Sequence, residues 1–553
     1  MTAWPETFLL FGGLGIWAAL FLVRLKGFLH VCQLEEYFTA SYVGWLWRHA
    51  AQHLHAGLLL IGPLPSALAA VALWTPLPAV GRWVALTAWG IAGLALLLLR
   101  QRRQARKPLA FTARATRLYA TATALGLGPP WATAFWALTR EPGAGADHAQ
   151  ATAIVLMAAA ALLGGYLLAL ANLLLFPWEE VTRQRFERAA RAIVRARRPR
   201  IIAVTGSAGK TTTKEILQAL LSTRYKVLRT PASFNTSMGV TRVIRESLTD
   251  QEIFIVEMGA YKRGDISRLC RLVGAPDIAI VTQINEQHLE RFGSLENTAR
   301  AKFECVAALR PGGTAILNFD NPHIRAFSST EPPARVIRYG TSPDLPLDLR
   351  ASNIVTGREG TSFDLAWTGQ HPLPIRTSLL GHHNVSNILA ATAAAHECGL
   401  EISAVASALR LLSPPRHRLQ PMPSSEGVTV LDDSYNANPD GLLEALDVLA
   451  SFGPRRRVLV TPGLVEMGPM QAHHHRRIGQ RAAGSCDLAI LVGPRQTDEI
   501  RLGLLDGGFT AERLHVARDF AHATDLLRSL GQPDDVVLFA NDLPDQYDEG
   551  LRI

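Results

Sequence analysis

Apolar residues form long uninterrupted runs in the first third of the chain and only short runs after it. A helix that crosses the roughly 30 Å hydrocarbon core of a bilayer needs about 20 apolar residues, because each residue adds about 1.5 Å. Five runs approach this length, at residues 7–23, 56–75, 83–99, 118–138 and 151–176. The second and fourth contain prolines, which a spanning helix tolerates where neighbouring groups satisfy the freed backbone. We predict an α-helical membrane domain of about five transmembrane helices over residues 1–180.

Basic residues alternate between rich and poor loops along these five runs. The first and third loops are rich in Lys and Arg, whereas the second and fourth contain only Arg82 and Arg140. Cytoplasmic loops carry the excess of basic residues, so this pattern predicts an N-terminus outside the cell membrane and cytoplasmic residues after Pro177. A cleaved signal peptide is excluded because Arg24 and Lys26 follow the first apolar run instead of preceding it. The alternative is a buried apolar helical domain, which would have to imitate the charge alternation.

Short apolar runs alternate with helical stretches from residue 200 onward. The runs are IIAVT, EIFIVEM, DIAIVTQI and GTAILNF, beginning at residues 201, 252, 277 and 313. This alternation is typical of a mostly parallel sheet with helices on both faces. The segment SPPRHR at 413–418 indicates a linker into a second α/β unit. We therefore predict a central domain over residues 181–414 and a C-terminal α/β domain over residues 415–553.

The first of these strands leads into the loop TGSAGKTTTK at residues 205–214. Small residues let backbone N–H groups approach a polyphosphate, and the following helix N-terminus favours negative charge. Lys210 is expected to reach the β and γ oxygens, and the Thr211 hydroxyl to ligate Mg²⁺. The loop is shorter than the general GxxxxGK[ST] pattern, because Val204 stands at the first glycine position. The loop predicts a bound nucleoside triphosphate with Mg²⁺, held by Gly206, Ser207, Ala208, Gly209, Lys210, Thr211 and Thr212.

Charge and cysteine content exclude two other classes. The net charge is +9, but much of the basic excess lies at residues 101–107 and 183–200, beside apolar segments. That distribution is typical of membrane proteins, so nucleic acid is not an expected partner. The five cysteines are scattered and form no CxxC pair, so neither a disulfide framework nor a zinc site is indicated.

Several further segments occur in an order and spacing that resemble the Mur ligases, the ADP-forming amide ligases of peptidoglycan precursor synthesis. They are FNTSMGV at 234–240, VEMGAYKRGDI at 256–266, TQINEQHLERFGSLENTARAKFE at 282–304 and GHHNVSNILAA at 381–391. DDSYNANPDG at 432–441 resembles the motif of the MurF branch, which adds D-alanyl-D-alanine to a UDP-MurNAc-tripeptide. The resemblance covers residues 195–545 and implies a P-loop ATPase domain followed by a Rossmann-like C-terminal domain.

This resemblance implies a reaction in which ATP phosphorylates a carboxylate and an amine then attacks the acyl phosphate. It assigns catalytic roles to Lys210, Glu257, His288 and Lys302. It assigns Mg²⁺ binding to Thr211 and Glu257 at a first site and to His288 and Lys302 at a second, with Lys302 carbamylated. It places the nucleotide at Asn384, Asn387, Arg418 and Asp433, and the substrates at Asn235, Tyr435, Asn436 and Asn438. Helix capping is the alternative for the two asparagines at 384 and 387.

The departures from the family concern the substrates. The membrane domain occupies the place of the UDP-binding domain, and TPGLVEMG at 461–468 and FANDLPDQYDEG at 539–550 replace two family segments. The three histidines at 473–475 suggest a metal, but adjacent helical residues point about 100° apart and cannot converge. We expect a membrane-anchored ligase, in contact with membrane lipid, that acts on a cell-wall precursor presented at the bilayer on a lipid. The alternatives are a soluble UDP-linked precursor, a different amide bond, and a non-catalytic nucleotide-binding scaffold.

Overall fold

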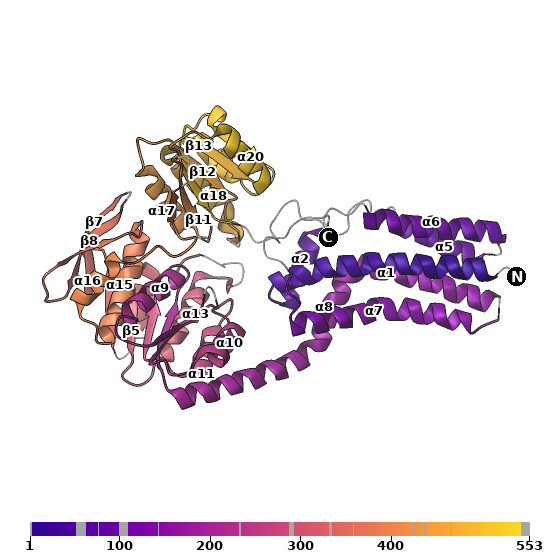
Figure 1. The fold of residues 1–553 in the computed structure, drawn as a ribbon, viewed down its shortest axis with the longest axis horizontal. Helices are drawn as coiled ribbons and strands as arrows, with labels where there is room; N and C mark the ends of the chain where they lie inside the picture. The colour runs from indigo at the N-terminus through magenta and orange to yellow at the C-terminus, as the bar shows by residue number, and fades with distance from the viewer. Residues whose placement is uncertain are drawn as a thin grey trace. The chain divides into compact units, whose positions relative to one another are not determined.

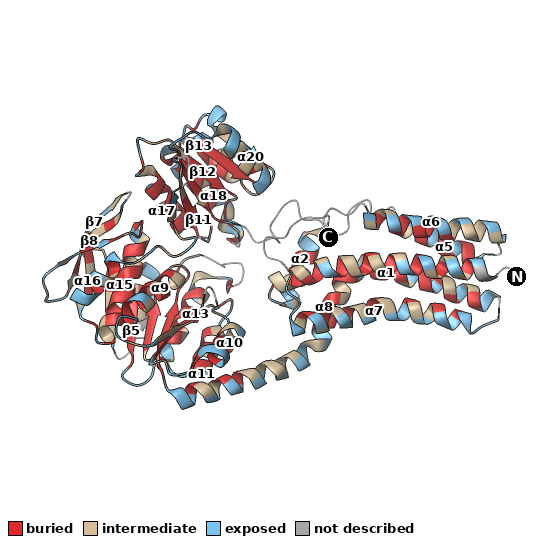
Figure 2. Ribbon diagram, in the orientation of Figure 1, coloured by how far each residue is buried: buried red, intermediate tan, exposed pale blue. Residues whose placement is uncertain are grey.

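The computed structural model describes residues 3–50, 62–75, 77–98, 109–141, 143–231, 234–286, 292–330, 335–357, 359–423, 427–435, 438–465 and 467–542. The chain divides into two compact units, with the division between Thr182 and Arg183 (Figure 1). Each unit has its own buried core, red in Figure 2.

The first unit is helical. Its helices are α1 (Ala3–Leu34), α2 (Thr39–Arg48), α5 (Pro63–Trp74), α6 (Ala79–Leu98), α7 (Ala113–Leu138) and α8 (Ala144–Arg197), the last continuing into the second unit. Within the described part of the chain, three helices are long and apolar enough to cross a membrane: Pro5–Leu34, Ala79–Leu98 and Ala144–Arg197. Helix α5 is apolar but short, and α7 contains Pro129 and Pro130. The number of five spans stays a prediction.

Small residues let α1 and α6 approach closely. A Cβ atom on Gly13 would lie 2.5 Å from the Trp89 ring, and one on Gly93 would lie 2.7 Å from Trp17 Nε1. The two indoles stack with ring centroids 6.0 Å apart, and Trp17 Nε1 donates to the Trp89 carbonyl oxygen at 3.0 Å. Glycines that admit a large side chain from the facing helix are typical of helix interfaces in membranes. Large apolar side chains on the outer faces are exposed, among them Phe135, Leu163, Leu173 and Phe176.

The second unit begins with a nine-stranded sheet in the order β2-β3-β1-β4-β5-β6-β7-β8-β9. Its strands are β1 (Arg200–Thr205), β2 (Val227–Arg229), β3 (Ile253–Glu257), β4 (Ile278–Val281), β5 (Thr314–Asn318), β6 (Val336–Gly340), β7 (Leu349–Gly357), β8 (Gly360–Trp367) and β9 (Leu373–Thr377). The pairs from β2 to β7 are parallel, and β7, β8 and β9 pair antiparallel. The carboxyl ends of the parallel strands therefore meet along one edge, where α/β proteins bind their ligands.

Alternation along β1 divides the core of this sheet into two layers. Ile202 and Val204 face one layer, with helices α9 (Lys210–Leu221), α15 (His382–Glu397) and α16 (Ile402–Arg410). Ile201 and Ala203 face the other layer, with helices α10 (Ser237–Ser247), α11 (Asp265–Val273), α13 (Leu295–Ala307) and α14 (Pro322–Thr330). Both faces of a parallel sheet are buried in this way because its crossover helices cover them.

A six-stranded sheet follows, in the order β10-β11-β15-β12-β13-β14. Its strands are β10 (Gln420–Pro423), β11 (Thr429–Asp433), β12 (Arg457–Thr461), β13 (Leu488–Val492), β14 (Leu514–Ala517) and β15 (Val536–Ala540); only β10 pairs antiparallel. Its helices are α17 (Pro439–Ala450), α18 (Gln471–Ser485), α19 (Asp498–Asp506) and α20 (Phe520–Leu530), with short 3₁₀ turns at Gly468–Met470 and Ala511–Arg513. The predicted fold class, apolar helices followed by two α/β sheets, is confirmed.

All five cysteines are buried and free. Burial raises the pKa of the Cys270 and Cys486 thiols to about 12 and that of Cys398 to about 11. These thiols pack as small apolar side chains.

Candidate active site

The loop between β1 and α9 requires its two glycines. Gly206 and Gly209 have φ angles of 149° and 81°, which other residues rarely adopt. A Cβ atom on Gly206 would lie 2.0 Å from Thr282 Oγ1, and one on Gly209 would lie 2.3 Å from Asn387 Oδ1. Gly209 is the N-cap of α9, and the first N–H groups of a helix have no partner within the helix, so they are available to an anion. This geometry suits a polyphosphate.

Lys210 begins α9 and folds back over this loop. Its Nζ donates to the carbonyl oxygens of Gly206 at 2.8 Å and Ser207 at 3.0 Å. Burial lowers the pKa of Lys210, while the charge of Glu257 opposes that shift. A lysine held by two carbonyl oxygens of the loop is already close to where the phosphates would lie.

Glu257, at the end of β3, is the centre of a buried polar cluster. It is 1% exposed, and its Oε2 accepts from Thr211 Oγ1 at 3.0 Å and from Lys214 Nζ at 2.9 Å. Its Oε1 accepts from Asn235 Nδ2 at 3.1 Å, so Asn235, predicted to contact substrate, contacts Glu257 here. Burial alone would raise the pKa of Glu257, but Lys214, Lys210 and the hydrogen bonds lower it below its ordinary value. The carboxylate is therefore charged.

The sequence reasoning missed Lys214. It lies four residues after Lys210 and so one turn further along the same face of α9. Its side chain is fully buried, and its ion pair with Glu257 holds the carboxylate in place. The final lysine of TTTK is the signal that could have identified it.

Lys302, on α13, is a buried lysine. It is 2% exposed, and its Nζ lies 5.8 Å from the centroid of the Phe292 ring. Burial, and then the charge of Lys210, lower the pKa of Lys302 to about 7. In the parts of the chain that the structure describes, no carboxylate lies within ion-pair distance of this amine. His288, the other residue predicted for the second metal site, lies outside the described residues.

The predicted magnesium site can be tested against the donors present. Among the described residues, no three His, Cys, Asp or Glu side chains form a group that could hold a metal ion. Thr211 and Glu257 nevertheless bring a hydroxyl and a charged carboxylate into contact, and both are oxygen donors of the kind that Mg²⁺ prefers. Mg²⁺ usually takes only one or two protein ligands beside phosphates and waters. These residues fit Mg²⁺.

A cavity of about 220 Å³ extends from this loop to the second sheet. Its wall includes, among the residues predicted for the site, Ala208, Gly209, Thr212, Asn387, Arg418, Asp433 and Asn438. It also includes residues that the sequence reasoning did not single out: Asn318, Asp320, Thr341, His383 and Glu444. The cavity thus joins the phosphate loop to the residues predicted to hold the rest of the nucleotide.

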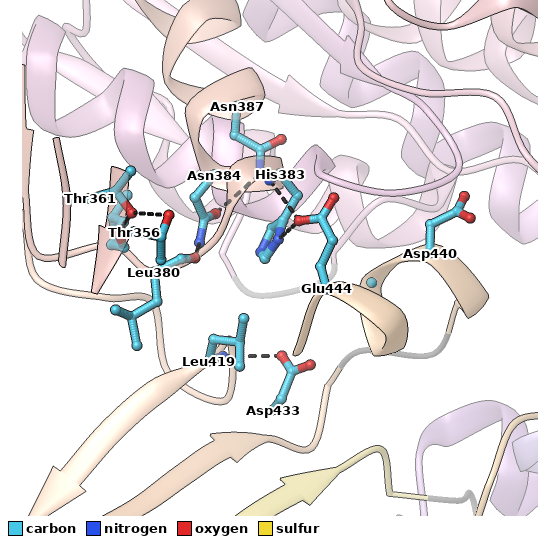
Figure 3. Close-up of polar contacts among 12 residues, drawn as sticks. Thr356, Thr361, Leu380, His383, Asn384, Asn387, Leu419, Asp433, Asp440 and Glu444 are labelled. Atoms are coloured by element: carbon cyan, nitrogen blue, oxygen red, sulfur yellow. Dashed lines mark hydrogen bonds and ion pairs between the residues drawn. The ribbon is translucent and has the colours of Figure 1, made fainter. Parts of the chain in front are cut away.

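The two asparagines of α15 form a chain of hydrogen bonds (Figure 3). Asn387 Oδ1 accepts from Thr213 Oγ1 at 3.2 Å, and Asn387 Nδ2 donates to Asn384 Oδ1 at 3.3 Å. Asn384 Nδ2 in turn donates to the Leu380 carbonyl oxygen at 2.7 Å. The N-cap of α15 is Gly381, so neither asparagine is its N-cap residue. Asn387 instead lies against Gly209 of the phosphate loop, and Asn384 is hydrogen-bonded to Asn387 and to Leu380.

The predicted residues of the second sheet differ in their surroundings. Asp433 lines the cavity, and its Oδ1 accepts from the Leu419 backbone N–H at 3.1 Å (Figure 3). Asn438 is the N-cap of α17 and accepts from the Gly441 N–H at 2.9 Å. Tyr435 is exposed and stacks on His417. Asn436 lies outside the described residues.

His383 and Glu444 connect α15 to α17 at the cavity (Figure 3). Glu444 Oε2 accepts from the His383 backbone N–H at 2.7 Å and also from the His383 ring. Burial lowers the pKa of His383, and so does the charge of Arg418. The charge of Glu444, the hydrogen bond from His383 to Glu444 and the charge of Asp433 raise it more, so the pKa of His383 lies above its ordinary value. A protonated His383 therefore strengthens the contact between α15 and α17 at the cavity.

This pair predicts a pH-dependent affinity for ATP. The contact needs a protonated His383 and an ionised Glu444, whose pKa the histidine lowers, so it holds between the two pKa values and is lost as the pH rises through that of His383. We expect the KM for ATP of the wild type to rise over that range. Glu444→Gln should raise the KM at neutral pH by about two- to tenfold, since the pair is partly exposed, and flatten the pH profile. Asp447→Asn, on the same helix with an exposed carboxylate, is the control; an unchanged profile in Glu444→Gln contradicts the prediction.

Two family models match the α/β part of this chain. A phosphate loop, a buried carboxylate beside it and a second α/β sheet closing the nucleotide cavity define a nucleotide-binding enzyme of the P-loop class. The model of the Mur ligase middle domain matches residues 204–395, and the model described as Mur ligase, glutamate ligase domain matches residues 417–541. The chain belongs to the Mur ligase family of ATP-dependent amide-bond ligases.

Individual relatives agree with this assignment. The chain is 34% identical over 367 residues to a UDP-N-acetylmuramoyl-tripeptide--D-alanyl-D-alanine ligase of Mycobacterium leprae, covering 61% of this chain and 70% of that protein. It is 35% identical over 296 residues to the protein of the same name from Escherichia coli, covering 53% of this chain and 64% of that protein. A crystal structure of MurF from Acinetobacter baumannii superposes with a TM-score of 0.59 at 25% identity, covering 67% of this chain and 79% of that one. The predicted resemblance is confirmed.

Proposed function

We propose that this protein is a membrane-anchored, ADP-forming amide ligase that acts through an acyl phosphate on a peptidoglycan or envelope precursor. The observation that carries the proposal is the contact of Thr211, Lys214 and Asn235 with the buried Glu257, beside Lys210 of the phosphate loop. A fixed, charged carboxylate next to a phosphate loop supports phosphoryl transfer, which depends mainly on positioning and neutralised charge.

The proposed reaction has two steps. In the first, a carboxylate oxygen of the acceptor attacks the γ-phosphorus of ATP, the bond to the β-γ bridging oxygen breaks, and ADP leaves. In the second, the amine attacks the carbonyl carbon, the bond from carbon to the phosphate oxygen breaks, and inorganic phosphate and a proton are released. Lys210 supplies positive charge at the transferring phosphoryl group, and the N-terminus of α9 binds the phosphates.

Mg²⁺ would be held by Thr211 and Glu257, and further by His288 and Lys302. When bound, it would neutralise phosphate charge. Lys214 and Asn235 keep the Glu257 carboxylate oriented for that role. Asn384, Asn387, Arg418 and Asp433 would hold the remainder of the nucleotide.

A scaffold that only binds nucleotide is the competing function. Such a protein has no need of a buried, charged Glu257 or of a buried Lys302 whose pKa lies near 7. These two groups favour catalysis. Within the ligase class, an amide bond other than the one named for the relatives is the second candidate, because the segments 461–468 and 539–550 depart from the family pattern.

We propose that the protein lies in the cell (inner or plasma) membrane. Its N-terminus would be outside, and residues 178–553 would be in the cytoplasm. The alternating loop charges support it. A single cysteine introduced at Thr2 should be labelled by a membrane-impermeant reagent applied from the outside. Single cysteines introduced at Gln104 and Ile553 should be labelled only when the reagent is applied from the inside. Labelling of position 104 from outside would refute the orientation.

We further propose that the acceptor is carried on a lipid. The apolar helices occupy about a third of the chain, and a carrier lipid would confine the acceptor to the bilayer surface and raise its effective concentration. The alternative is that the apolar helices only anchor a ligase that uses a soluble UDP-linked precursor.

Initial rates with ATP should therefore be higher for a lipid-linked precursor in liposomes than for its UDP-linked counterpart, with products identified by mass spectrometry. Removing residues 1–180 should reduce the lipid-linked rate selectively. A clear preference for the UDP-linked form that survives this truncation would defeat the lipid proposal. Absence of ADP and amide product with every precursor would defeat the ligase proposal itself.

A further inference from the structure

Polar side chains hold one end of the helical unit together. Asn172 of α8 is 6% exposed, and its Nδ2 donates to the Tyr37 carbonyl oxygen and to Thr39 Oγ1, both at 2.9 Å. Gln33 of α1 donates to the Ala110 carbonyl oxygen at 2.9 Å and accepts from the Ala110 N–H at 3.0 Å. The turn from α1 to α2 is thereby fixed against α8, and the segment before α7 is fixed against α1.

The turn between α1 and α2 has an unusual backbone. Glu36 and Tyr37 have φ angles of 53° and 61°, in the left-handed region that residues with a side chain rarely adopt. Such residues cost free energy and are concentrated at functional sites. The Tyr37 hydroxyl accepts from Gln33 Nε2 at 3.2 Å, and its carbonyl oxygen is bound by Asn172. Both ends of this tyrosine are therefore held in place.

Arg114, in the first turn of α7, lies over the Tyr37 ring. Its guanidinium carbon is 4.2 Å from the ring centroid. Cation–π attraction holds a guanidinium at this distance and uses none of its N–H donors, which lie in its own plane. Two parallel N–H donors of an arginine match two oxygens of a phosphate. Arg114 is thus positioned to bind a phosphate group.

The protein makes little use of the Arg114 donors. Nη2 lies 3.5 Å from Asn172 Oδ1, and Nε is buried without a hydrogen-bond partner among the described residues. Glu179 of α8, whose charge also acts on Arg114, pairs with Arg117 at 2.7 Å. Within the described ranges, Arg114 itself makes no ion pair. Buried polar atoms are nearly always paired, and charged side chains of membrane domains mark ligand sites, so these donors point to an anion.

The location limits the chemistry of that anion. The proposed topology assigns the end of α1, the start of α7 and the end of the apolar part of α8 to the cytoplasmic side of the bilayer. Trp47 of α2 and Trp178 of α8 are exposed, and tryptophan is enriched at the boundary between membrane and water. The anions concentrated at that boundary are the phosphate groups of lipids.

We propose that Arg114, held on Tyr37, binds the phosphate group of the lipid that carries the acceptor. The inference rests on the proposed function, in which the acceptor is lipid-linked, and adds the side chain that recognises the carrier. The ligand class is a phosphate ester of a long-chain lipid. Binding involves no covalent step, so it requires neither ATP nor the amine.

The test measures lipid binding to the full-length protein in detergent by native mass spectrometry. A polyprenyl phosphate is the probe, and the uncharged polyprenol and phosphatidylglycerol are the comparison lipids. The wild type should bind the polyprenyl phosphate at least about tenfold more tightly than either. Arg114→Ala should weaken this binding about ten- to hundredfold, the range expected for a hydrogen bond between charged groups, and leave polyprenol binding unchanged.

Arg140→Ala is the matched control. Arg140 follows the other end of α7 and also lies over an aromatic ring, that of Trp136, at 4.5 Å. This variant should bind the polyprenyl phosphate as the wild type does. Arg114→Gln keeps a polar side chain without the charge, so it should lose as much affinity as Arg114→Ala, and it decides the question if the alanine variant does not fold. Thermal unfolding of each variant is followed in parallel.

Unchanged affinity for the polyprenyl phosphate in a folded Arg114→Ala or Arg114→Gln protein overturns the inference. Equal binding of polyprenol overturns it too, because the chain alone would then determine affinity. Equal binding of phosphatidylglycerol would assign Arg114 to bulk anionic lipid, and displacement of the probe by equimolar inorganic phosphate would assign it to a soluble anion; either result also overturns it. Absence of ADP and amide product, by contrast, overturns the proposed function and leaves the measured lipid affinities as they are.

Discussion

Lys210→Ala is expected to abolish ATP turnover while leaving the fold intact. The Lys210 ammonium is held at the phosphate loop by the carbonyl oxygens of Gly206 and Ser207, close to where the phosphoryl group would transfer. Removing one preorganised charge or donor from such a site typically lowers the rate by about 10²- to 10³-fold, and we expect at least that loss.

The measurement is the initial rate of ADP release in the presence of acceptor and amine, with thermal unfolding followed in parallel. Lys226→Ala is the matched control, because Lys226 is an exposed lysine of the same domain that pairs with surface Asp250. The control should retain wild-type activity. A correctly folded Lys210→Ala protein with wild-type turnover would remove the phosphate loop from the mechanism.

Lys302→Ala is the second substitution expected to have a large effect. A buried lysine whose pKa is about 7 is partly neutral at physiological pH, and a neutral amine can react with CO₂ to form a carbamate. The carbamate would replace a cation by a negative oxygen ligand, which Mg²⁺ favours. Lys302→Ala should lose about 10²-fold or more of the ligation rate, with partial recovery when a short carboxylic acid such as acetate is added.

Two further variants separate carbamylation from charge. Lys302→Arg keeps a cation but cannot form the same carbamate, so it should also be inactive; full activity in this variant would contradict the prediction. Arg300→Ala, on the same helix α13 with an exposed side chain paired to Glu296, should have wild-type activity. Mass spectrometry of the intact protein at neutral pH in bicarbonate measures the modification directly.

Local sequence signals were sufficient to predict features that depend only on residues close together in the chain. The glycines and small residues of 205–214 require a loop between a strand and a helix, and the structure places that loop at the carboxyl end of β1. Glu257 was assigned through the family resemblance, and it ends β3, at the ligand edge of an α/β fold. For the loop, the information lies within about ten residues.

Contacts between distant segments could not be derived in this way. Glu444 receives the backbone N–H of His383, 61 residues earlier, and no local pattern joins the two. Lys214 was passed over as an ordinary helix residue, although its side chain is fully buried against Glu257. Each depends on the packing of side chains that the sequence alone does not place.

The buried cysteines make this protein a convenient subject for site-directed probes. Thiolate is the reactive form, and the raised pKa values of Cys270, Cys398 and Cys486, together with burial of all five thiols, should make them slow to react with maleimides. Fluorophores or spin labels can then be attached at single introduced cysteines without first replacing the native ones. Signals from such labels during turnover would report catalytic cycling in native lipid, with the wild-type protein serving as the unlabelled blank.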